Sequence, residues 1–147
     1  MYDVPFGVCE ILSNEIILED LSFDDDYDIV FVNFGTDKAV KIFSYFKKIR
    51  QERINGFLDI FKSVGVELYL KDVLGVLHIV LLDILLADTN KQVLIVSDTG
   101  FTLESILFLQ QNFKLLMGNF SNKSILIYDE HLSKATFKID FKRGLLL

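Results

Sequence analysis

The chain has 147 residues, 51% of them apolar, and its 15 basic and 21 acidic side chains leave a net charge of −6 at neutral pH. This length fits one domain over residues 1–147, and the 14 Phe and 5 Tyr exclude the disordered class, which holds too few apolar side chains to form a core. Because Cys9 is the single cysteine, no intramolecular disulfide can form, and we expect a reducing intracellular compartment such as the cytoplasm.

The N-terminal region predicts an antiparallel hairpin. Residues 6–12 and 15–21 are two short β-prone runs, and the turn-prone pair Ser13-Asn14 separates them. A hairpin of this kind is expected at the edge of a sheet.

A strongly acidic segment coincides with this hairpin and the loop that follows it. Residues 1–30 carry nine acids and no Lys or Arg, whereas residues 31–147 carry a net charge of +3. The acids are densest at Asp24, Asp25 and Asp26. One interpretation is a solvated loop, and the other is an interaction surface that binds a basic face of this chain or a basic partner.

Four runs with continuous apolar centres predict core strands that are covered on both faces. They occupy residues 27–34, 66–70, 93–96 and 125–128. A further run, residues 135–141, alternates polar and apolar side chains and predicts an edge strand near the C-terminus.

Helical periodicity lies between these runs. Residues 37–53 predict a first helix with basic side chains on its exposed face, and an extension to Lys62 with a break at Gly56 remains open. Residues 102–118 predict a helix that ends at Gly118.

The helix predicted over residues 72–87 is apolar nearly all round, so we expect it to be deeply buried. Residues 77–82 taken alone also fit a strand, and the length of the whole run favours the helix. The run is shorter than the roughly 20 residues that a membrane-spanning helix needs, so no membrane partner is expected.

The order of the elements predicts an α/β fold of three layers, with a mainly parallel sheet between helices on both faces. The N-terminal hairpin and the C-terminal strand would add to its edges. Leu145, Leu146 and Leu147 form an apolar end that either packs into the core or is covered by another molecule, and the second alternative indicates self-association.

Ligands of open α/β folds bind beyond the carboxyl ends of the strands. Asp72, Asp98 and Asp129 each follow a predicted strand, and their oxygen atoms would suit Mg²⁺, with Lys71 beside them to compensate phosphate charge. The competing interpretation is that these side chains only form turns and helix caps.

The other candidates for chemistry are weaker. The cations of the first helix could contact nucleic acid, but the overall acidity argues against this partner. His78 lies in an apolar helix, where a neutral core histidine is expected, and Cys9 has no cation beside it in the sequence, which indicates a structural thiol.

The sequence therefore predicts a non-catalytic protein-interaction or regulatory module without a cofactor. It would bind a protein, including a second copy of itself, through Asp24–Asp26 and Leu145–Leu147. The alternative is a Mg²⁺-dependent enzyme that acts on a phosphorylated or nucleotide substrate at Asp72, Asp98 and Asp129.

Overall fold

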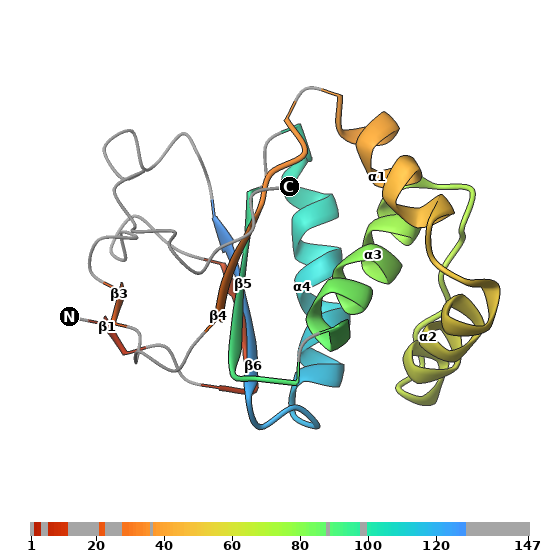
Figure 1. Ribbon diagram of the computed structural model, residues 1–147. Helices are drawn as coiled ribbons and strands as arrows, with labels where there is room; N and C mark the ends of the chain where they lie inside the picture. The colour runs from red at the N-terminus through yellow and green to blue at the C-terminus, as the bar shows by residue number, and fades with distance from the viewer. Residues whose placement is uncertain are drawn as a thin grey trace.

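The computed structural model describes residues 2–3, 6–11, 21–22, 28–35, 37–87, 89–97 and 100–128, and the structural statements below concern these residues (Figure 1). They form an α/β fold with six strands and four helices. The strands are β1 (Tyr2–Asp3), β2 (Cys9–Ile11), β3 (Leu21–Ser22), β4 (Asp28–Val32), β5 (Gln92–Ser97) and β6 (Lys123–Tyr128). The helices are α1 (Lys38–Lys47), α2 (Gln51–Ser63), α3 (Val73–Ala87) and α4 (Leu103–Met117).

The main sheet contains four parallel strands in the order β2-β6-β5-β4. Phe31 of β4 pairs with Ile95 of β5, which in turn pairs with Leu126 of β6, so the apolar centres of the three strands lie side by side. The strands predicted within 27–34, 93–96 and 125–128 are confirmed by β4, β5 and β6. Every residue of β5 and β6 is buried, as expected for strands that are covered on both faces.

All four described helices lie on one side of the main sheet (Figure 1). The chain moves in one direction across the sheet from β4 to β5 to β6, and right-handed crossovers in one direction place their helices on the same face. The prediction of helices on both faces is therefore wrong for the described helices.

These helices form two tiers (Figure 1). The inner tier, α3 and α4, lies next to the sheet, and α1 and α2 pack on its outer side. Because α3 is enclosed from both sides, its residues 76–82 are fully buried, which confirms the prediction of a deeply buried helix and explains the lack of a polar face. None of the helices in the described ranges is both long and apolar enough to cross a membrane.

The segment predicted as a strand at residues 66–70 is instead an irregular connection from α2 to α3. Val66 is buried while Glu67 and Tyr69 are exposed, so the alternation comes from packing against helices. The first predicted helix is in fact two helices, since Arg50 has an extended backbone that turns the chain between α1 and α2. Gly56 lies inside α2 and does not break it.

The predicted N-terminal hairpin does not agree with the strand pairs in the described residues. β2 pairs with β6, and β3 pairs with β1, and both pairs are parallel, whereas a hairpin joins antiparallel neighbours. Residues 12–20 lie outside the described residues, as does the predicted edge strand at 135–141.

Candidate functional site

The predicted metal ligands are only partly described. Asp72 is exposed in the turn before α3, where its backbone N–H donates to the carbonyl oxygen of Tyr69 at 3.1 Å. Because the segment before it is not a strand, Asp72 does not follow the carboxyl end of a strand as predicted. Asp98 and Asp129 lie outside the described residues, and within those residues no three acidic, His or Cys side chains form a metal-binding group. The magnesium site remains a prediction.

The predicted interaction residues cannot be placed on this fold. Asp24, Asp25 and Asp26 follow β3 in the sequence and lie outside the described residues, as do Leu145, Leu146 and Leu147. Their roles remain predictions, and a candidate surface must be sought among the described side chains.

At the carboxyl ends of β4 and β5, the described polar groups shape turns. The Asn33 side-chain oxygen accepts a hydrogen bond from the backbone N–H of Gly35 at 2.9 Å. Thr102 caps α4 by accepting from the N–H of Ser105, and the Lys38 ammonium lies 4.5 Å from the ring centre of Phe101. These local contacts match the turn-and-cap interpretation of this edge.

A three-helix polar cluster surrounds the carboxylate of Asp83 on α3. One carboxylate oxygen accepts from Nε and an Nη of Arg53 on α2, at 3.0 and 2.7 Å, and the other accepts from the Tyr45 hydroxyl on α1 at 2.8 Å. Burial, together with the hydrogen bond and charge of Asp83, raises the pKa of the Tyr45 phenol. The cluster ties the outer tier to the inner one.

A basic hollow of about 380 Å³ opens beside this cluster, at the junction of α1 and α2. It is lined by Tyr45, Lys48, Ile49, Arg50, Arg53 and Asp83. Asp83 is already neutralised by Arg53, whereas Lys48 and Arg50 are exposed and their side chains make no ion pair or hydrogen bond within the described part of the chain. The hollow therefore presents net positive charge.

An apolar hollow of about 440 Å³ lies on the outer side of α1 and is lined by Ala39, Val40, Phe43, Ser44 and Lys47. Val40 is 68% exposed, Phe43 is half-buried and Lys47 is exposed. Ser44 on α1 lines this hollow, and Lys48, the C-cap residue four positions further along, lines the basic one, so the two hollows are neighbours at the end of the helix.

We call the two hollows together the basic-apolar face. It is formed by Val40, Phe43, Lys47, Lys48, Arg50 and Arg53. Residues 37–53 carry six bases and two acids, a net charge of +4, in a chain whose total charge is −6. The periodicity of the first predicted helix identified its exposed cations, but the two hollows depend on how α1 and α2 pack.

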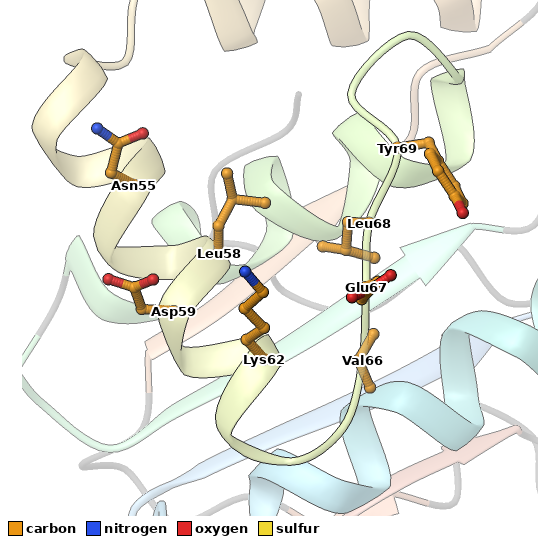
Figure 2. Close-up of a pocket in the computed structure, with 8 residues that line it drawn as sticks. All are labelled: Asn55, Leu58, Asp59, Lys62, Val66, Glu67, Leu68 and Tyr69. Atoms are coloured by element: carbon orange, nitrogen blue, oxygen red, sulfur yellow. The ribbon is translucent and has the colours of Figure 1, made fainter.

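A third hollow, of about 350 Å³, lies between α2 and the connection to α3 (Figure 2). Leu58 on α2 and Leu68 on the connection point toward one another across it, and Lys62 and Glu67 lie at its rim. The connection rests directly on Gly75 of α3, where a Cβ atom would overlap the backbone of Tyr69. The rim of this third hollow carries charges of both signs, so the hollow favours a charged partner of either sign less than the basic-apolar face favours an acidic one.

His78 is fully buried between α3 and α4 and acts as a structural link. The Leu74 carbonyl oxygen can only accept, so at 2.6 Å it takes a hydrogen bond from Nδ1–H, which leaves Nε2 to accept from the Asn112 side-chain amide at 3.0 Å. Three phenylalanine rings, those of Phe61, Phe108 and Phe113, surround the imidazole. Burial lowers its pKa to about 4, so the ring is neutral at pH 7.

Cys9 is buried at the start of β2, and burial raises the pKa of its thiol to about 12. The thiolate is the nucleophilic form, so this cysteine is unreactive at neutral pH.

The comparisons with protein-family models, with curated proteins and with solved structures found no match for this chain.

Proposed function

We propose that the protein is a non-catalytic interaction module whose basic-apolar face binds an acidic polypeptide segment that also carries apolar side chains. The observation that supports this most directly is that Lys47 lines the same hollow as the exposed Val40, while Lys48 and Arg50 line the neighbouring basic hollow. Within the residues that the structure describes, the side chains of these three cations have no ion-pair or hydrogen-bond partner. The acidic segment at Asp24–Asp26 and the apolar end at Leu145–Leu147 belong to the same proposal, as further contact regions.

The two hollows suit different parts of such a segment. An apolar side chain placed against Val40 and Phe43 would gain about 25 cal/mol for each Å² of apolar surface removed from water. Carboxylates placed beside Lys48 and Arg50 would add about 0.2–1 kcal/mol per exposed pair. Binding should therefore be moderate in strength, and it should weaken when salt screens the charges.

Arg53 has a different role on this face. Its guanidinium is held by Asp83 and lies 5.0 Å from the ring centre of Phe57, so it is fixed in place. It supports the basic hollow, while Lys48 and Arg50 remain available for a partner.

A labelled synthetic peptide of Asp, Glu, Leu and Phe tests the proposal by fluorescence anisotropy with the full chain. We expect saturable binding that weakens at least about fivefold when salt rises to about 0.5 M. The double variant Lys48→Glu, Arg50→Glu should bind about tenfold more weakly, because two attractions become repulsions. A single-stranded oligonucleotide is run in parallel, and tighter binding of the oligonucleotide than of the peptide would contradict the proposal.

Matched controls come from other exposed side chains. The double variant Lys62→Glu, Lys114→Glu, on α2 and α4, changes the net charge by the same amount as Lys48→Glu, Arg50→Glu without touching the basic-apolar face. Val40→Ser should weaken binding, and Leu103→Ser, which removes a similarly exposed apolar side chain from α4, should not. Equal effects of the face variants and the controls would refute the proposal.

A further inference from the structure

The exposed side of α4 carries more apolar side chains than a solvent-facing helix surface usually does. Seven residues of α4 are exposed, and we call them the α4 face: Leu103, Glu104, Leu107, Phe108, Gln111, Lys114 and Leu115. Four of the seven are apolar, and Leu103 and Leu115 are 70% and 54% exposed. A helix that is buried on one side normally directs polar side chains to the other. Apolar side chains gathered on one exposed surface indicate a contact with another molecule.

The α4 face is continuous along the helix. Leu103, Leu107, Gln111 and Leu115 follow one another at intervals of four residues, a spacing that forms a ridge on a helix surface. At 1.5 Å per residue this ridge is about 18 Å long. In the inner tier α4 lies beside α3, and α1 packs on α3, so the outer tier leaves the ridge exposed (Figure 1).

We propose that this ridge packs against the same ridge of a second copy of the chain, with the two α4 helices antiparallel about a two-fold axis. Packing of two such ridges is the commonest contact between helices in globular proteins. With the axis at the height of Leu109, Leu103 lies at the height of Leu115 of the second copy. Leu107 then lies at the height of Gln111 of the second copy. The apolar side chains of both copies are thereby removed from water.

The charges of the α4 face are complementary in the same arrangement. Glu104 lies at the height of Lys114 of the second copy, and the two-fold axis creates this pair twice. Within the described residues, the side chains of Glu104 and Lys114 make no ion pair or hydrogen bond, and ten residues along one helix is too far for them to pair with each other. A parallel arrangement would bring like charges together, so the charges select the antiparallel one.

This arrangement also fixes the size and strength of the assembly. A surface that contacts its own copy is isologous and closes at two chains. The seven residues of the α4 face are fewer than the about 20–30 residues per side of a standard stable interface, so we expect a reversible dimer. The pair needs two α4 helices, so no segment of the same chain can replace the second copy in it. The inference is also independent of the proposed function, because the α4 face shares no residue with the basic-apolar face.

Sedimentation velocity of the full chain over a range of concentrations tests the inference. The unmodified chain should shift from monomer to dimer as its concentration rises, and it should not grow further. Leu107→Ser and Leu115→Ser should each weaken dimerisation about tenfold, because the two-fold axis removes each apolar contact twice. The control Val40→Ser, on α1, changes a side chain that is 68% exposed and should dimerise like the unmodified chain. An unmodified chain that stays monomeric, or equal effects of the α4 variants and Val40→Ser, would overturn the inference.

Charge reversal tests the antiparallel register. Glu104→Lys and Lys114→Glu should each dimerise about tenfold more weakly, because each variant replaces two attractions by two repulsions. A mixture of these two variants should dimerise again, because the copies then carry opposite charges at both contacts, and this recovery also shows that both variants are folded. Asp59→Lys and Lys62→Glu, on α2, are the matched controls and should leave dimerisation unchanged. Single variants that dimerise like the unmodified chain, or a mixture that stays monomeric, would refute the pairing.

Discussion

The buried imidazole of His78 makes the stability of the fold depend on pH in a defined direction. In the unfolded chain a histidine titrates near pH 6.5, while in the folded chain the pKa of His78 is about 4. Between these two pKa values the unfolded state binds a proton that the folded state does not, so the free energy of unfolding rises with pH. The stabilising contribution of the neutral imidazole is therefore complete above about pH 6.5 and is lost as the pH falls toward 4.

The size of this effect follows from the two pKa values. One pKa unit corresponds to about 1.4 kcal/mol, so the full contribution above pH 6.5 is about 3 kcal/mol. Between pH 7 and pH 4.5, His78 should reduce the free energy of unfolding by about 2 kcal/mol. Protonation would also remove the acceptor that Nε2 offers to the amide of Asn112.

Urea unfolding followed by circular dichroism over this pH range measures the effect. The carboxylates titrate in the same range, so the informative quantity is the difference between the unmodified chain and His78→Gln, which does not titrate and keeps a polar group facing Asn112. The unmodified chain should lose about 2 kcal/mol more than the variant between pH 7 and pH 4.5. His131→Gln serves as the control for the other histidine, and parallel pH profiles for the unmodified chain and His78→Gln would refute the reasoning.

Three further predictions use other parts of the structure. Gly75→Ala should destabilise the fold by about 1–3 kcal/mol in thermal unfolding, because the new methyl group meets the backbone of the α2–α3 connection. Gly56→Ala, which has open space around it, should instead stabilise the fold by about 0.5–1 kcal/mol. Stabilisation by both variants would disprove the predicted clash at Gly75. Asp83→Asn should cost about 1 kcal/mol, and a double-mutant cycle with Arg53→Gln should show coupling that decreases with salt, so full additivity would exclude the ion pair as a stabilising contact. If the alternative Mg²⁺ enzyme is correct, added Mg²⁺ will raise the thermal midpoint of the unmodified chain and not that of Asp98→Ala, and an unchanged midpoint would count against that alternative.

Several elements could be predicted because their signals are local. The strands β4, β5 and β6 carry continuous apolar runs, which is the pattern of strands buried on both faces. The helix α3 is long and apolar all round, and this predicted both its type and its deep burial. The exposed cations of α1 follow from helical periodicity in the same way.

The error at residues 66–70 has a clear physical cause. Val66 and Leu68 pack toward the interior and alternate with the exposed Glu67 and Tyr69, so the side chains follow the period of a strand. An alternation of buried and exposed side chains shows which residues face the interior. It does not show whether a neighbouring strand is present to form hydrogen bonds with the backbone. The prediction for Asp72 depended on this strand and lost its basis with it.

The sequence by itself determined which segments of this protein are buried, since the hydrophobic effect acts on each apolar run wherever it lies in the chain. Only the tertiary structure decided which side of the sheet the helices cover, because this depends on the order in which distant strands pair. The same holds for the candidate site: Tyr45, Arg53 and Asp83 come together from three helices, 30 and 38 residues apart in the sequence. The basic-apolar face exists because α1 and α2 pack as an outer tier on α3, a contact that no local pattern encodes.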